Sequence, residues 1–167
     1  TIRNQIKQFK KQYLQLIKNA QKIIPQKKAV FKNKNSKKRS KNRTKISASG
    51  YWKLGDLFRK FNENVEHEFE ITNYGAALQQ DFGLTIRYVQ ELIIFAELFK
   101  KEEIDDSISI SMYRAFVWKK NQLQEIGQLN REKKRLMKRA KSHQTMNYKI
   151  YQKELTELVN QKHSSFR

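Results

Sequence analysis

Residues 74–99 read YGAALQQDFGLTIRYVQELIIFAELF, and this stretch decides the fold that we expect. It predicts a helix, a sharp turn at Gly83 and a second helix, because its apolar side chains recur at the spacing that holds two such helices at a steep angle. Those side chains are Leu78, Phe82, Leu84, Val89 and Leu92. Gly83 tolerates the positive φ that the turn needs, and Thr85 suits the N-cap of the second helix. The stretch is therefore expected to form a helix-turn-helix unit.

The start of the second helix is the part that would enter the major groove if the unit reads DNA. Its expected outward positions are Thr85, Ile86, Arg87, Gln90 and Glu91. Arg87 suits a bidentate contact with guanine and Gln90 one with adenine, whereas Glu91 would repel phosphate. Gln79 stands where the motif usually has a small residue, and helix-turn-helix units also serve as core scaffolding. The sequence leaves both roles open.

The charge of the chain is large and unevenly distributed. The 167 residues include 36 Lys and Arg against 16 Asp and Glu, a formal net charge of +20. Residues 1–55 carry 17 basic and no acidic side chains, residues 56–118 carry 6 basic and 12 acidic, and residues 119–167 carry 13 basic and 4 acidic. A surplus of this size predicts a polyanionic partner. DNA is the first candidate, RNA the alternative, and a membrane surface comes after both.

Several function classes find no support in the sequence. Cysteine is absent, which excludes disulfides and indicates a reducing compartment. No apolar run is long enough to span a bilayer, and no signal peptide is visible. We find no phosphate-cradling glycine loop, nucleophile elbow, metal cluster or methyltransferase signature. The expected protein is thus not an enzyme and uses no cofactor, metal or small-molecule substrate. It is expected inside the cell, in the nucleus of a eukaryote or otherwise in the cytoplasm.

Residues 1–24 are predicted to form an amphipathic helix with a heptad seam. The seam consists of Ile2, Ile6, Phe9, Tyr13, Leu16, Ala20 and Ile23. Such a seam packs on its own domain, docks a partner protein or lies on a membrane surface. A long polar segment separates it from the rest of the chain and favours docking, so we assign Ile2, Ile6, Phe9, Tyr13, Leu16 and Ile23 to partner binding.

A basic linker is expected over residues 25–49. Pro25 ends the first helix, and residues 26–48 have too few apolar side chains to fold alone, which predicts disorder. The densest basic run consists of Lys37, Lys38, Arg39, Lys41 and Arg43. Such a run binds phosphate, acts as a nuclear-import signal or is simply a solvated linker. We assign it to DNA binding.

A helical core is expected over residues 50–121, followed by basic C-terminal helices over residues 122–167. The apolar spacing predicts a continuous helical stripe from Lys119 to Ala140. Ser111 is the expected N-cap of the helix before this stripe, and the last helix is expected over residues 145–160. Seven basic residues lie in the run 131–141, REKKRLMKRAK, a density that packing does not require. We therefore predict that phosphate contacts Lys133, Lys134, Arg135, Lys138 and Arg139. A second import signal is the other interpretation.

Five short segments carry a family resemblance. They are residues 51–55 (YWKLG), 74–78 (YGAAL), 81–85 (DFGLT), 95–99 (FAELF) and 109–115 (SISMYRA). In order and spacing they resemble the helical N-terminal domain, of unknown function, found ahead of PD-(D/E)XK restriction-like nucleases. The resemblance covers residues 51–120 and implies an all-helical module associated with DNA. It implies no catalysis, because no PD…(D/E)XK arrangement follows.

The sequence as a whole predicts an all-α, noncatalytic DNA-binding protein. Its build also resembles, without a shared motif, the small accessory subunits of ciliate adenine-N6 DNA methyltransferase complexes. We therefore expect an accessory subunit that docks DNA onto a larger DNA-modifying assembly. The alternatives are a standalone regulator that reads sequence through the helix-turn-helix, and an RNA-binding protein.

Overall fold

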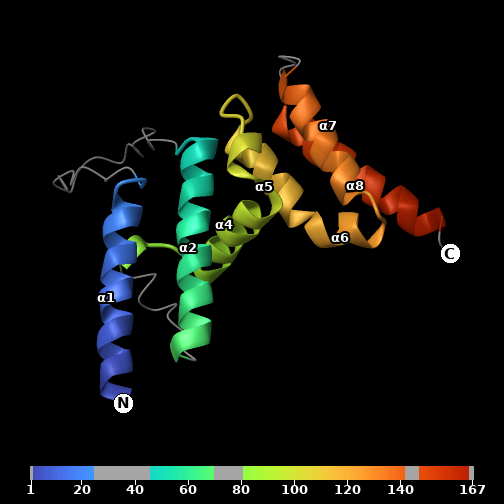
Figure 1. Cartoon of the computed structure of the whole chain (residues 1–167). Coiled ribbons are helices and arrows are strands. Elements are labelled where there is room, and N and C mark those ends of the chain that lie inside the picture. Colours follow the sequence, from blue (N-terminus) through green and yellow to red (C-terminus); the bar gives the residue numbers. More distant parts are fainter. Residues whose placement is uncertain (1, 25–45, 70–80, 142–146, 166–167) are drawn as a thin grey trace, which may run out of the picture.

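The computed structural model describes residues 2–24, 46–69, 81–141 and 147–165, and every regular element within them is helical. The all-α class is therefore confirmed. The elements are α1 (Ile2–Gln21), α2 (Ala48–Phe69), α4 (Ile86–Leu98), the 3-10 turn η1 (Lys101–Glu103), α5 (Ile110–Trp118), α6 (Lys120–Glu125), α7 (Leu129–Lys141) and α8 (Tyr148–Ser165) (Figure 1). No helix in the described ranges has the length and hydrophobicity needed to cross a membrane.

The seam of α1 packs against the chain itself. Helices α1 and α2 lie side by side and antiparallel (Figure 1). The rings of Phe9 and Tyr13 each lie 5.8 Å, centroid to centroid, from that of Phe61 on α2, and Leu16 and Ala20 are buried. These contacts correct our assignment of Phe9, Tyr13, Leu16 and Ile23 to a partner protein, since all four belong to the chain's own core. The side chains of Ile2 and Ile6 lie outside the described part of the structure.

Helix α4 occupies the centre of the core, between α2 and α5. Leu92 and Phe95 are fully buried, and the Phe95 ring lies 5.1 Å from that of Tyr51 on α2 and 5.0 Å from that of Tyr113 on α5. Gly55 allows α2 to approach α4, because a Cβ at this position would lie 2.1 Å from the Leu92 carbonyl oxygen. In the C-terminal half of α4, Leu92, Phe95 and Ala96 are thus buried, while Ile93, Ile94 and Leu98 are partly buried.

The C-terminal helices form a second layer, in which α5 packs against α8 and α7 lies beside α8 (Figure 1). The helical stripe predicted from Lys119 onward is not continuous. Gly127, with a φ of 65°, ends α6, and the Gln128 N–H donates to the Leu123 carbonyl oxygen at 2.8 Å. This left-handed glycine cap turns the chain before α7 begins.

Some predicted boundaries are wrong by a few residues. Helix α2 begins at Ala48, which is buried, so the end of the segment predicted to be disordered belongs to the fold; residues 25–45 lie outside the described ranges. The same helix continues to Phe69. Ser109, and not Ser111, is the N-cap of α5. These differences arise because helix ends are set by packing as well as by local sequence.

Candidate nucleic-acid interface

The turn before α4 has the geometry that the sequence predicts. Gly83 has a φ of 64°, and the Thr85 hydroxyl accepts a hydrogen bond from the Tyr88 N–H at 3.2 Å. Thr85 is therefore the N-cap of α4. The first helix of the predicted unit falls mostly on residues 70–80, which lie outside the described ranges. The helix-turn-helix itself thus stays a prediction.

Replacing Gly83 by Val is expected to lower the free energy of unfolding by roughly 1–3 kcal/mol, because a β-branched residue is strained at positive φ. Steric overlap with the described residues does not contribute, since none of their heavy atoms lies within 4 Å of a Cβ placed at this glycine. Urea denaturation measures the loss. Gly83→Asn is the control and should lose less, because Asn tolerates this conformation. Equal losses in the two variants would contradict the backbone explanation.

Three of the predicted base-reading residues lie on the surface, and their neighbour Glu91 does not. Thr85, Arg87 and Gln90 are exposed at the start of α4, as predicted. Glu91, which we expected to face outward and repel phosphate, is only 7% exposed. That expectation is wrong, because Glu91 faces α2 and α5 and is hydrogen-bonded there.

The Glu91 carboxylate accepts four hydrogen bonds from three side chains. The Tyr51 hydroxyl donates at 2.5 Å, the Trp118 Nε1–H at 2.8 Å, and Arg114 donates through both Nε and Nη2. Burial and the hydrogen bond to Glu91 raise the pKa of the Tyr51 hydroxyl, which keeps it a donor. The acceptor sites of Glu91 are thus filled, and Arg114 compensates its charge. Glu91 therefore does not oppose an anion near Arg87.

Three of the five predicted phosphate-binding residues on α7 form ion pairs within the chain. Arg135 and Arg139 lie 3.0 and 2.7 Å from Glu154 on α8. Lys133 lies 2.7 Å from Glu103. Although burial alone would raise it, hydrogen bonds from Lys133 and the Lys100 backbone lower the pKa of Glu103. This corrects our view that packing does not require the basic density of α7, because these side chains join α7 to its neighbours.

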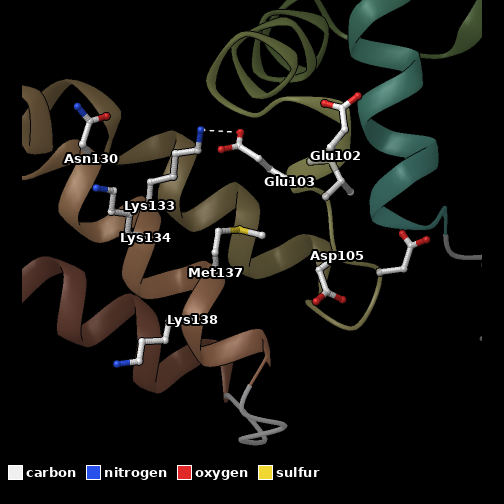
Figure 2. Close-up of a pocket in the computed structure, with 10 residues that line it drawn as sticks. Glu102, Glu103, Asp105, Asn130, Lys133, Lys134, Met137 and Lys138 are labelled. Carbon is white, nitrogen blue, oxygen red and sulfur yellow. Dashed lines mark hydrogen bonds and ion pairs between the residues drawn. The ribbon is translucent and has the colours of Figure 1, made fainter.

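The acidic loop after α4 consists of residues 102–106, and a cavity of about 800 Å³ separates it from α7. Figure 2 shows Lys133 reaching across to Glu103, while Lys134 and Lys138 extend away from the loop. Glu102, Asp105 and Asp106 line the opposite wall. The acidic wall disfavours a phosphate inside the cavity. Lys134 and Lys138 are exposed and form no ion pair among the described residues, and phosphate binding by these two lysines stays a prediction.

A basic stripe on the outer face of α1 was missed by our sequence-based site assignment. We call Lys7, Lys11, Lys18 and Lys22 the α1 lysine stripe; all four are exposed. Their spacings of four, seven and four residues bring them to one side of the helix, opposite the seam. No acidic residue occurs in residues 1–55 to compensate them. The spacing of these lysines is visible in the sequence, opposite the apolar seam.

Neither the basic run at residues 37–43, nor a metal site, nor a comparison with known proteins adds to this description of the interface. Lys37, Lys38, Arg39, Lys41 and Arg43 lie outside the described ranges. In the part of the chain that the structure describes, no group of three or more His, Cys, Asp or Glu side chains is placed to hold a metal. Comparisons with protein-family models, curated proteins and solved structures find no match.

Proposed function

We propose that the protein is a noncatalytic DNA-binding protein that acts as an accessory subunit of a larger DNA-modifying assembly. The observation that carries the proposal is the α1 lysine stripe. The seam of α1 is held in the core, so the stripe is fixed on the outside of a folded helix. It extends about 22 Å at a rise of about 1.5 Å per residue. Cations in a row along a folded helix suit contacts with the regularly spaced phosphates of a duplex.

Other basic residues extend the same function. Lys134 and Lys138 offer two more exposed cations on α7. The basic run at residues 37–43 follows α1 in the sequence and carries no acidic residue. Contacts of this kind bind phosphate without regard to base sequence and position the protein on DNA. Arg87 and Gln90 then supply any base preference.

The accessory role needs a protein-contact surface other than the seam of α1. Ile150 on α8 is 59% exposed, more than any other large apolar side chain in the described ranges. Leu14 on α1 is 58% exposed, and single exposed apolar side chains of this kind are ordinary on protein surfaces. The accessory role is therefore tested by identifying the proteins that copurify with the native protein.

Binding to two unrelated duplexes should fall steeply and equally as salt increases. Neutralising six phosphates, through the α1 lysine stripe, Lys134 and Lys138, gives a log–log slope of about −5, since each contributes about −0.9. Fluorescence anisotropy between roughly 50 and 200 mM salt measures the slope. An affinity that does not respond to salt would contradict the proposal, and tighter binding to an RNA duplex would reassign it to RNA.

A further inference from the structure

A small cavity lies where α4 faces the junction of α5 and α6. Its volume is about 210 Å³. The side chains that matter for its chemistry are Arg87, Gln90, Trp118, Lys120 and Asn121. Sites for drug-sized ligands measure roughly 300–1,000 Å³. This cavity is smaller, so it suits one flat ring rather than a whole cofactor.

Trp118 is held rigidly although 49% of it is exposed. Its indole N–H donates to Glu91 at 2.8 Å, and the Arg114 guanidinium carbon lies 5.1 Å from the centre of its ring. The indole ring of Trp118 is therefore held by the hydrogen bond at its edge and by the Arg114 cation. About half of its surface stays accessible at the cavity. A fixed aromatic ring loses little conformational entropy when a ligand stacks on it.

The polar side chains around Trp118 are available to a ligand. Arg87, Gln90, Lys120 and Asn121 form no side-chain hydrogen bond or ion pair among the described residues. Glu91 also lines the cavity, but its acceptor sites are filled and Arg114 compensates its charge. The rim therefore carries two uncompensated cations and two amides. Amides pair with the edges of bases, and cations with phosphate.

We propose that this cavity binds an unpaired base of single-stranded DNA. The base stacks on Trp118, Gln90 and Asn121 contact its edge, and Arg87 and Lys120 hold the flanking phosphates. A single strand is favoured over a duplex because stacking on Trp118 needs a free base face, which a duplex buries between its neighbours. An acidic peptide would use the two cations but would leave the ring and the amides without partners. The inference rests on the proposed DNA-binding function.

Two substitutions of Trp118 separate stacking from simple apolar contact. Trp118→Leu removes the aromatic face and is expected to weaken binding of oligothymidine by roughly five- to 150-fold, the usual effect of losing one base–aromatic stack. Trp118→Phe keeps a ring, although it also loses the hydrogen bond to Glu91, and should retain most of the affinity. An abasic strand of the same length carries the same phosphates and should bind the wild-type protein and Trp118→Leu equally.

The fluorescence of Trp118 reports the stack directly. The chain has two tryptophans, and Trp52 is the other. In a Trp52→Phe background, oligothymidine should quench the remaining emission while the abasic strand should not. Thermal melting of each variant verifies the fold, since Trp52 donates to the Phe99 carbonyl oxygen at 2.7 Å and loses that bond here.

The outcomes distinguish this inference from the proposed function. Equal oligothymidine affinity of folded Trp118→Leu and wild type, or absence of quenching, would overturn the base-binding cavity. If duplex binding still falls steeply with salt in that case, the proposed function stands without it. If the protein binds neither duplex nor single strand, both fail.

Discussion

Replacing Glu91 by Leu is expected to lower the free energy of unfolding by about 3 kcal/mol, the lower end of the cost of breaking a buried ion pair, because the remaining Arg114 charge is partly screened by solvent. The substitution leaves the Arg114 guanidinium, 34% exposed, without its carboxylate. It also removes the acceptor of the buried Tyr51 hydroxyl and of the Trp118 indole N–H. The buried Tyr51 hydroxyl contributes most to this loss, because a donor left unsatisfied in the core costs more than its hydrogen bond contributes when it is made.

Urea denaturation measures this loss, and two variants control it. Glu97→Leu makes the same chemical change at an exposed position of α4 and should change the unfolding free energy by less than about 0.5 kcal/mol. Arg114→Leu combined with Glu91→Leu should recover much of the stability, because no charge is then left without its partner. A loss at Glu91 no larger than that at Glu97 would contradict the structural role of the carboxylate.

The sequence predicts those parts of the fold that local spacing determines. The apolar spacing of residues 74–99 correctly places Val89 and Leu92 in the core. Gly83 has the positive φ that the turn requires, and Thr85 caps the helix. Each of these features depends on residues within one or two turns of one another. Periodicity and capping chemistry describe such short distances well.

Features that depend on distant residues could not be predicted in this way. Glu91 was expected on the surface because of its position at the start of the second helix, but its donors Tyr51 and Arg114 are 40 and 23 residues away in the sequence. The acidic partner of Arg139, Glu154, is 15 residues away, on another helix. The apolar seam likewise predicts that α1 packs against an apolar surface, but it does not predict which helix or protein provides that surface. The long polar segment after α1 suggested another protein, whereas the partner is α2.

The corrected positions change which basic residues are expected to bind DNA. Arg135 and Arg139 each form an ion pair with Glu154, so phosphate would have to compete with a carboxylate for them. The lysines of the α1 stripe form no ion pair with any carboxylate of the described residues. Binding of phosphate by the stripe releases counterions without first breaking an ion pair.

Changing Lys7, Lys11, Lys18 and Lys22 together to Ala is therefore expected to give the largest loss of DNA affinity. The log–log salt slope should become shallower by about 3.6, because each neutralised phosphate contributes about 0.9. Between roughly 50 and 200 mM salt, the wild type should consequently lose about 150-fold more affinity than the variant. The side chains are exposed, so the fold should be retained, and circular dichroism verifies this.

A second variant separates the position of the charges from their number. Changing Lys53, Lys101, Lys149 and Lys153 to Ala removes the same net charge from exposed positions on α2, η1 and α8. If the α1 lysine stripe binds the phosphates, this control should keep a slope close to that of the wild type, because a charge that contacts no phosphate releases no counterion on binding. Equal slopes in the two variants would mean that the protein is attracted to DNA by its total charge and that α1 has no special place in the interface.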